Sequence, residues 1–327
     1  MKLIILTRSS HVGGGTTHTE MLARGLNERG HECRVAFTRS GHSKTIAHRR
    51  MSDITVESMC YQYQYVDYPN AIADNIEAFR PDWVLVDNPE KVNQAWPLSE
   101  RLRFGSTKVA FIAHTEGTPK SMMTQMQTYF SKVICVSQRS ADLLEAFDPV
   151  VIRNGVRPPL SKGEDVRGRL EIPEGEFVIG YVGRHDSNKN PNALVAAAEQ
   201  EDWWCVLAGP QAAFDGDHPK KLRVEPGEID NAGDWYRAMD VFVLPSVMEG
   251  FALSPMESLM AGTRVAMTPT SDYEDCFSEA VSFFDHGDVN GLIWAAQSAP
   301  DPSIGQEIIE REFTLDRMVT DYEEALR

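Results

Sequence analysis

Short runs of almost wholly apolar residues recur along the chain and constrain its fold more than any other feature. The runs show no alternation of apolar and polar residues, so each predicts a strand that is covered on both faces, as the strands of parallel sheets are. They lie at Leu3–Leu6, Val35–Phe37, Trp83–Val86, Val109–Ile112, Val133–Val136, Phe177–Val182, Trp204–Ala208, Val241–Leu244 and Arg264–Met267.

Between these runs the apolar residues recur with the period of a helix. An alternation of buried strands and amphipathic helices predicts an α/β architecture. The helix-period stretches are His18–Arg29, Ala71–Phe79, Gln138–Phe147, Ala193–Gln200 and Ser254–Ala261.

The strand and helix pattern starts afresh after a segment rich in Pro, Gly and charged residues at 153–172, which predicts a domain boundary there. We expect two Rossmann-like domains with a cleft between them, at residues 1–155 and 156–302. Residues 303–327 are expected to form closing C-terminal helices.

Composition narrows the class of protein. The 327 residues are 42% hydrophobic and 24% charged, which is typical of a globular chain, and no apolar run reaches the length of a membrane span. The five cysteines are scattered, without the spacing of a zinc site or a disulfide framework. We therefore expect a cytoplasmic protein with reduced thiols and no transmembrane segment.

The net charge of −16 is unevenly distributed. Residues 1–153 carry 18 Lys and Arg against 16 Asp and Glu, whereas residues 154–327 carry 14 against 32. The acidic second half disfavours nonspecific nucleic-acid binding there. The first half contains a basic run at residues 39–50, which is either a solvated loop or a contact for an anionic acceptor such as a phosphorylated lipid, a glycan or a nucleic acid.

Three loops contain residues suited to a phosphorylated sugar ligand. Gly13, Gly14 and Gly15 open the first helix, where backbone N–H groups can face an anion, although a tight turn would be the better interpretation if no other segment supported a phosphate. The segment from Gly183 to Lys189 follows a strand and places Arg184 and Lys189 where they can neutralise a diphosphate.

The third loop is the segment EGFALSPME, in which Glu249 and Glu257 bracket the entry to a helix. Carboxylates accept hydrogen bonds from sugar and ribose hydroxyls. The alternative for Glu257 is a capping box with Ser254 as N-cap and Pro255 at the first helical position. That alternative leaves Glu249 without a role.

The combination of these segments resembles the retaining GT-B glycosyltransferases of family 4 over most of the chain. The resemblance depends on the order of the segments. The two most specific are GRHDSNK and PSVMEGFALSPMESLMAG. The segments are the Gly-rich loop ending at His18, His114 after VAFIA, VSQRSADLL at 136–144, IRNGV at 152–156, GRHDSNK at 183–189 and PSVMEGFALSPMESLMAG at 245–262.

The resemblance implies an acceptor domain at residues 1–155, a nucleotide-sugar donor domain at residues 156–302, and roles for individual residues. The implied catalytic residues are Glu249, His114, Arg184 and Lys189. The implied donor-binding residues are Gly13, Gly14, Gly15, Arg184, Lys189, Glu249, Gly250, Phe251, Ala252, Leu253 and Glu257. Residues assigned to an acceptor are His11, His18, Arg49 and Arg50.

The implied reaction is the transfer of a hexose, with retention, from a nucleotide diphosphate sugar to a hydroxyl acceptor, which can be a glycan, a lipid-linked sugar or a small molecule. A UDP-sugar is the first expectation for the donor and a GDP-sugar the second. No metal or other cofactor is expected, because Asp215-Gly216-Asp217 lies in a polar loop and no histidine pair has zinc-site spacing. Peripheral contact with a membrane remains compatible with an anionic acceptor.

Three other functions remain open from the sequence. The basic run permits transfer to a modified nucleic-acid base, although no aromatic residues are interleaved with it. A nucleotide-sugar epimerase would use a similar two-domain architecture without an external acceptor. A non-catalytic sensor of nucleotide sugars would bind without turnover.

Overall fold

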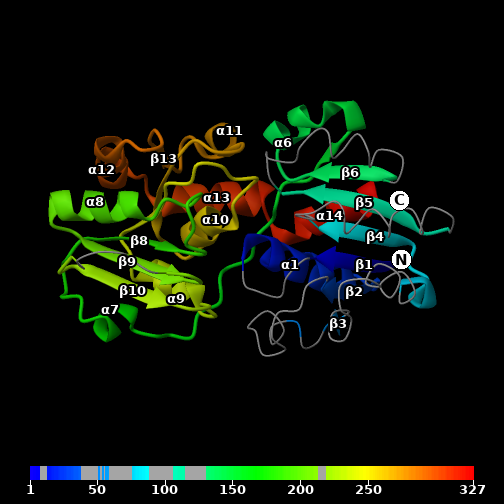
Figure 1. The fold of residues 1–327 in the computed structure, drawn as a ribbon, viewed down its shortest axis with the longest axis horizontal. Coiled ribbons are helices and arrows are strands. Elements are labelled where there is room, and N and C mark those ends of the chain that lie inside the picture. The colour runs from blue at the N-terminus through cyan, green and yellow to red at the C-terminus, as the bar shows by residue number, and fades with distance from the viewer. Residues whose placement is uncertain are drawn as a thin grey trace. The chain divides into compact units, whose positions relative to one another are not determined.

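The computed structural model describes residues 1–7, 13–37, 51, 54, 56–58, 76–87, 106–114, 130–212 and 219–327. The chain divides into two compact units (Figure 1). The first contains Met1–Asn154 together with Leu315–Arg327, and the second contains Gly155–Thr314. Each unit is built on one parallel β-sheet.

The sheet of the first unit has seven strands among the described residues, in the order β3-β2-β1-β4-β5-β6-β7, and all its pairings are parallel. The central strands are buried along almost their whole length. The bounds are β1 Lys2–Thr7, β2 Glu32–Phe37, β3 Val56–Ser58, β4 Trp83–Asp87, β5 Lys108–Ala113, β6 Lys132–Cys135 and β7 Val150–Val151.

The sheet of the second unit has six strands in the order β10-β9-β8-β11-β12-β13, again all parallel. The bounds are β8 Val178–Val182, β9 Trp204–Gly209, β10 Leu222–Pro226, β11 Val241–Leu244, β12 Arg264–Met267 and β13 Ser282–Phe283. In both sheets the first strand of the unit lies in the middle, between its second and fourth strands. This doubly wound order confirms the prediction of two Rossmann-like domains.

Helices connect and cover the strands. In the second unit α8 and α12 pack against each other on one side of the sheet, and α9 lies on the other side (Figure 1). The bounds are α1 Gly14–Glu28, α6 Gln138–Leu143, the 3₁₀ turn η1 Glu145–Phe147, α7 Val166–Arg169, α8 Asn192–Glu201, α9 Ala232–Arg237, α10 Leu253–Met260, α11 Tyr273–Phe277, α12 Val289–Ser298, α13 Pro302–Glu312 and α14 Leu315–Ala325. Among the described helices, none combines the length and apolarity that crossing a bilayer requires.

Every predicted apolar run coincides with a strand, within three residues at each end. The sequence did not reveal β3, β7, β10 and β13. Three of these strands, β7, β10 and β13, are partly exposed, and β7 and β13 have only two residues each, so none of the three forms the long apolar run that marks a doubly covered strand.

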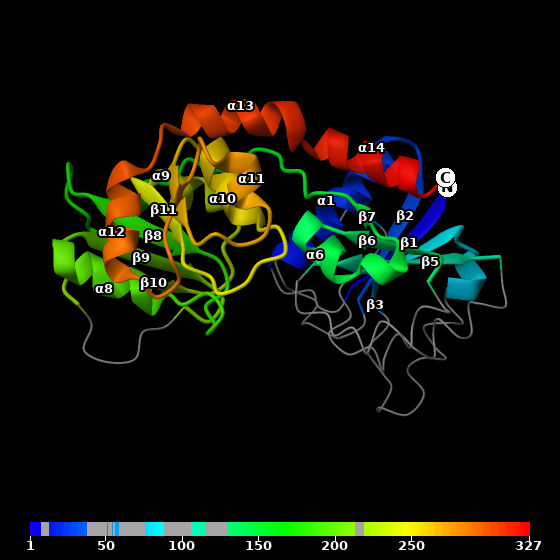
Figure 2. The same ribbon diagram turned by 90° about the horizontal axis from the view of Figure 1, so that it is seen from above.

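The expected closing helices at 303–327 are two helices that belong to different units. Helix α13 packs against α10 in the second unit, whereas α14 packs against α1 in the first. The indole Nε1–H of Trp83 donates to the carbonyl of Leu326 at 2.8 Å, which fixes the end of the chain beside β4. The two ends of the chain consequently lie close together (Figure 2).

The contact between α1 and α14 depends on a glycine. A Cβ added at Gly25 would lie well inside 3.0 Å of a methyl group of Val319, a distance that real Cβ atoms do not show. Residue 25 is in the middle of a helix, where Ala is intrinsically better than Gly by about 1 kcal/mol. The sequence uses glycine there because the two helices approach too closely for a side chain.

We predict that Gly25→Ala destabilises the protein by about 1–3 kcal/mol through overpacking, despite the better helix propensity of alanine. The free energy of unfolding in urea measures this. The double variant Gly25→Ala/Val319→Ala should be more stable than the sum of the two single effects predicts, because the second change removes the clashing methyl groups. Additive effects, or a stabilised Gly25→Ala, would show that α14 does not pack on α1 in solution.

Candidate donor site and a buried histidine cluster

The residues predicted to bind a nucleotide sugar follow two adjacent strands of the second sheet. Arg184 and Lys189 come after β8, and Glu249 comes after β11, the neighbour of β8. Between these strands the order of the sheet reverses, because β8 continues to β9 on one side while β11 lies on the other. Ligands of open α/β sheets bind at the carboxyl edge of such a point.

Two glycines set the path of the loop after β8. The amide of Gly183 donates to the carbonyl of Ala208 at 2.9 Å, which continues the ladder between β8 and β9. Gly209 has φ +133° and faces the Gly183 carbonyl so closely that a Cβ would collide with it. The chain therefore turns immediately after Gly183. The hydroxyl of Tyr181 donates a 3.1 Å hydrogen bond to the Arg184 carbonyl and so fixes the turn.

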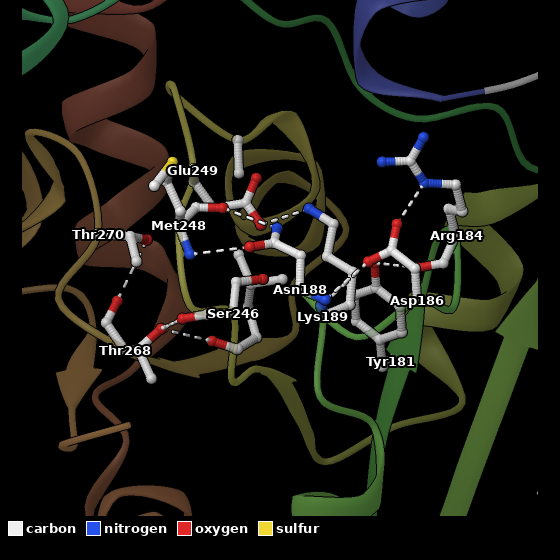
Figure 3. A network of polar contacts seen from close by, with 12 residues as sticks. Tyr181, Arg184, Asp186, Asn188, Lys189, Ser246, Met248, Glu249, Thr268 and Thr270 are labelled. Carbon is white, nitrogen blue, oxygen red and sulfur yellow. Dashed lines mark hydrogen bonds and ion pairs between the residues drawn. The ribbon is translucent and has the colours of Figure 1, made fainter. Parts of the chain in front are cut away.

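Both predicted phosphate-binding cations are paired with carboxylates (Figure 3). Arg184 Nε lies 2.7 Å from Asp186 Oδ2, and the Arg184 side chain is 57% exposed. Lys189 Nζ contacts Glu249 Oε1 in a much more buried pair, in which the side chains are 16% and 10% exposed. The structure thus brings Lys189 together with Glu249, 60 residues further along the chain.

Asn188 joins the loop after β8 to the loop after β11. Its side-chain amide donates to the carbonyl of Met248 at 2.9 Å and accepts from the Met248 amide at 3.1 Å. Its own carbonyl accepts from the amide of Val247 at 2.8 Å. These three bonds place Glu249 next to Lys189, as Figure 3 shows.

The segment after β12 donates side-chain hydrogen bonds to backbone carbonyls of the loop after β11. Thr268 donates its hydroxyl hydrogen bond to the Ser246 carbonyl at 2.6 Å. The hydroxyls of Ser271 and Tyr273 donate to the carbonyls of Gly250 and Ala252. The turn at residues 249–252 is therefore fixed by side chains that the sequence analysis did not single out.

Helix α10 begins two residues earlier than a capping box at Ser254 requires. Its N-cap is Ala252, which makes no side-chain cap hydrogen bond, so Leu253 is the first helical residue. The capping-box alternative for Glu257 is therefore wrong. Glu257 Oε2 instead accepts a 3.0 Å hydrogen bond from the hydroxyl of Tyr236. The first backbone N–H groups of a helix have no intrahelical acceptor and carry the positive end of its dipole.

The aromatic side chains beneath these loops are buried and uncharged. Burial, followed by the negative charge of Glu257, raises the pKa of Tyr236 well above its usual value. Burial and the charges of Glu249 and Glu257 do the same for the pKa of Tyr273. These phenols keep their protons and act as hydrogen-bond donors. The ring of Tyr273 also stacks on that of Phe251, with centroids 4.9 Å apart.

The first sheet brings a different group of residues to its own point of strand reversal, between β1 and β4. Gly14 and Gly15 begin α1, with Gly13 as N-cap. Among the described residues, no atom lies within 4 Å of a Cβ added at any of these three glycines. Their φ angles are not in the left-handed region, so open space above the backbone, rather than a special turn, distinguishes these positions.

Asp87 ends β4 and His114 follows β5, and the two side chains meet. His114 Nε2 lies 2.5 Å from Asp87 Oδ1, at ion-pair distance. The hydroxyl of Thr19 donates to Asp87 Oδ2, and His18 Nδ1 lies 3.9 Å from the same oxygen. His18 Nε2 lies 3.3 Å from the hydroxyl of Tyr322 on α14. We call these five side chains the histidine cluster.

His114 is the most accessible charged or imidazole group of the histidine cluster. Its side chain is 10% exposed, against 1% for Asp87 and for His18. His18 was predicted to contact the acceptor, but a side chain that is 1% exposed offers little surface for such a contact. The potential ligand atoms of His18, Asp87 and His114 all lie within 4.8 Å of one another, so these three side chains are the group among the described residues that could hold a metal ion.

Burial and pairing set the charges in the cluster. Burial is the largest single influence and raises the pKa of Asp87, but the charge and hydrogen bond of His114, together with those of His18, outweigh it and hold the pKa below its usual value. Burial lowers the pKa of His18, as does the charge of His114, and Asp87 opposes them only in part. Asp87 is therefore ionised and His18 neutral near pH 7.

Other predicted positions lie outside the described residues. These are His11, Arg49 and Arg50, assigned to an acceptor, and most of the loop that carries Asp215-Gly216-Asp217. Sequence reasoning missed Asp87, although it is the polar residue that directly follows the apolar run of β4. It also missed Asn188, Tyr236 and Tyr273, whose partners are distant in the sequence.

Two family models match the chain. That of the group 1 glycosyl transferases covers residues 163–300, and that of glycosyltransferase family 4 covers residues 12–158. The chain is 30% identical over 221 residues to the lipopolysaccharide core biosynthesis mannosyltransferase LpsB of Rhizobium meliloti, covering 61% of this chain and 59% of that protein. It is 33% identical over 162 residues to a D-inositol 3-phosphate glycosyltransferase of Streptosporangium roseum, covering 42% of this chain and 37% of that protein.

Solved structures resemble the chain over its full length. The crystal structure of Anabaena HepE with UDP-glucose has a TM-score of 0.83 at 17% identity, covering 100% of this chain and 99% of that one. Sucrose-phosphate synthase of Thermosynechococcus elongatus has a TM-score of 0.78 at 16% identity, covering 99% and 98%. The chain belongs to the group 1 and family 4 glycosyltransferases, and its two Rossmann-like domains define the GT-B fold.

We predict that Asn188→Ala lowers the free energy of unfolding by about 1–3 kcal/mol, because it removes both side-chain hydrogen bonds to the Met248 backbone, each worth about 0.5–1.5 kcal/mol. Urea unfolding checks this. The matched control is Gln200→Ala, which removes an exposed amide that bonds Asn290 in the same unit. Equal effects of the two changes would show that Asn188 does not join the two loops in solution.

Proposed function

We propose that the protein is a retaining glycosyltransferase that transfers a hexose from a nucleotide diphosphate sugar to a hydroxyl acceptor. The observation that carries the proposal is the pairing of Lys189 with Glu249 at the strand reversal of the second sheet. A cation for the diphosphate and a carboxylate for the sugar hydroxyls stand side by side there, next to the first turn of α10.

Arg184 and Lys189 are proposed to stabilise the negative charge that develops on the departing nucleoside diphosphate. The Arg184–Asp186 pair is exposed, and such pairs contribute only about 0–1 kcal/mol, so a diphosphate can replace Asp186 at little cost. The Lys189–Glu249 pair is more buried and keeps both groups oriented before the donor arrives. Positioning and charge stabilisation are then the main sources of rate acceleration.

The two carboxylates are proposed to read different parts of the donor. Glu249 accepts from hydroxyls of the transferred sugar, and Glu257, which the hydroxyl of Tyr236 orients, accepts from the ribose. The backbone N–H groups of Phe251, Ala252 and Leu253 are proposed to face the diphosphate, together with those of Gly14 and Gly15. His114 is proposed to act near the sugar and the reacting centre.

The names of related proteins support a panel of donors rather than one. HepE was crystallised with UDP-glucose, whereas LpsB is named a mannosyltransferase. We keep a UDP-sugar as the first proposal and a GDP-sugar as the second. The D-inositol 3-phosphate glycosyltransferase supports an anionic hydroxyl acceptor as one class to test. The proposed reaction uses no metal, because the two cations neutralise the diphosphate.

A cytoplasmic location is proposed from the cysteines. Cys33, Cys135 and Cys205 are free and buried in the structure. Burial raises the pKa of Cys33 and of Cys135 to about 12, so these thiols are protonated and unreactive at neutral pH. Buried reduced thiols without pairing are typical of proteins from a reducing compartment.

The direct test combines donor binding and turnover. UDP, GDP, ADP and their sugars are screened by thermal shift, since a specific ligand raises apparent stability by mass action. Transfer is then followed with a panel of glycan, lipid-linked and polyol phosphate acceptors. We expect Arg184→Ala and Lys189→Ala each to lower the transfer rate by about 10²-fold or more without unfolding the protein.

The control variants are Lys162→Ala and Arg311→Ala, exposed cations of the same unit that form ion pairs elsewhere. They should leave binding and transfer unchanged. Wild-type turnover in Arg184→Ala or Lys189→Ala would overturn the assignment. Isomerisation of the donor without an acceptor would instead indicate an epimerase, binding without any turnover a sensor, and transfer only to a nucleic acid a base-modifying enzyme.

A second experiment separates the two carboxylates. We predict that Glu257→Gln weakens binding of UDP and of UDP-sugar by the same factor, because both contain the ribose. Glu249→Gln should weaken UDP-sugar relative to UDP, because only the former offers sugar hydroxyls. Titration calorimetry gives the Kd of each variant relative to the wild type, for UDP and for UDP-sugar. If the thermal-shift screen identifies a nucleotide other than UDP, that nucleotide and its sugar are used instead. The opposite pattern would exchange the two roles.

A further inference from the structure

The histidine cluster places a fully buried carboxylate against the residue that the family resemblance connects with the reacting centre. Asp87 is 2% exposed and lies at the carboxyl end of β4, beside β5, which His114 follows. A buried carboxylate is costly unless it is paired and hydrogen-bonded. Here both oxygens are engaged, Oδ1 by His114 and Oδ2 by Thr19.

Asp87 and its neighbours determine which ring nitrogens of His18 and His114 carry protons. Burial and the charge of Asp87 raise the pKa of Tyr322 well above its usual value, so this phenol remains a donor and faces His18 Nε2. A neutral His18 that accepts at Nε2 carries its proton on Nδ1, on the side of Asp87. Because Asp87 is ionised, the nitrogen of His114 that faces it must likewise carry a proton.

We propose that Asp87 is a positioning residue for His114, holding its ring with the proton on Nε2 and leaving Nδ1 as the nitrogen offered to the sugar substrate. Thr19 fixes the carboxylate from α1. His18 and Tyr322 connect the same carboxylate to α14. This inference rests on the proposed function, in which His114 acts near the sugar.

The geometry favours a shared proton over a metal ion. Ligands about 2.1 Å from a tetrahedral zinc ion lie about 3.4 Å apart. His114 Nε2 and Asp87 Oδ1 are 2.5 Å apart, which is an ion-pair contact closer than two ligands of one zinc ion lie. The edge-to-face arrangement of the His18 and His114 rings, with centroids 4.7 Å apart, packs the two imidazoles directly against each other.

In the tautomer with its proton on Nε2 alone, His114 has a lone pair on Nδ1. That lone pair can accept a hydrogen bond from a sugar hydroxyl, which fixes the hydroxyl relative to the reacting carbon. An Asn at position 87 whose carbonyl remains with the Thr19 hydroxyl turns its amide N–H toward His114 Nε2. The amide then favours the other tautomer, with the proton on Nδ1, and the lone pair is no longer available to the substrate.

The first measurement needs no enzymatic activity. Protein labelled with ¹⁵N-histidine is studied by long-range ¹H–¹⁵N NMR near pH 7, with His114→Gln identifying the signals. We expect His114 to carry its proton on Nε2 in the wild type and on Nδ1 in Asp87→Asn. The matched control is Asp82→Asn at the other end of the same strand, where an exposed carboxylate accepts from the Lys2 amide. It should leave the tautomer unchanged.

The second measurement uses the transfer assay. Asp87→Asn should lower kcat by about 10²-fold with little change in the donor KM, because a misplaced proton affects the reacting state more than binding. Tyr322→Phe should lower kcat less, and Asp82→Asn should leave it unchanged. Circular dichroism and thermal unfolding verify that each variant is folded.

Three results would overturn the proposal. The first is a wild-type His114 with its proton on Nδ1, which is decisive even if Asp87→Asn fails to fold. The second is a wild-type kcat in folded Asp87→Asn. The third is a stoichiometric metal ion, found by elemental analysis of the purified protein and lost in Asp87→Asn. If the wild type transfers no sugar from any donor, the proposed function fails, and the tautomer measurement still decides the role of Asp87.

Discussion

Parallel strands that are covered on both faces all end at one edge of their sheet, and the rest of this structure depends on that constraint. A doubly covered strand cannot carry a polar side chain along its length without a buried partner, so functional groups gather where the strands stop. In each sheet the first strand of the unit is central, and the chain leaves it in both directions. The loops after the first and fourth strands therefore meet at this point.

The two units use this meeting point in a similar way. In the second unit, Glu249 after the fourth strand pairs with Lys189 after the first. In the first unit, Asp87 at the end of the fourth strand contacts Thr19 on the helix after the first strand, and it also contacts His114 after the fifth. In both cases a buried or half-buried carboxylate holds a basic side chain, and buried tyrosines with raised pKa values supply neutral donors nearby. Burial is tolerated because each charge has a partner.

Several properties could be predicted because their signals are local. Uninterrupted apolar runs identified the buried strands, and the restart of the pattern after residue 153 indicated a second sheet. The loop at 183–189 and the segment around Glu249 could be recognised because each contains its residues within a few positions. The edge strands β10 and β13 were missed because they are partly exposed, and partly exposed strands lack the uninterrupted apolar run of a buried strand. The capping-box interpretation of Glu257 failed because Ala252, not Ser254, begins the helix.

The amino-acid order alone specified the α/β class, the family and the groups proposed to bind a diphosphate sugar, since these depend on residue types at short spacing. Contacts between distant segments were decided only by the folded chain. Lys189 meets Glu249 across 60 positions, and His18 meets Tyr322 across 304. The role of Asp87 belongs to this second kind, because a single acidic residue after a strand has no meaning until packing brings the two histidines and a threonine around it. Apolar periodicity records which face of an element is buried, but only close packing decides which buried polar groups become partners.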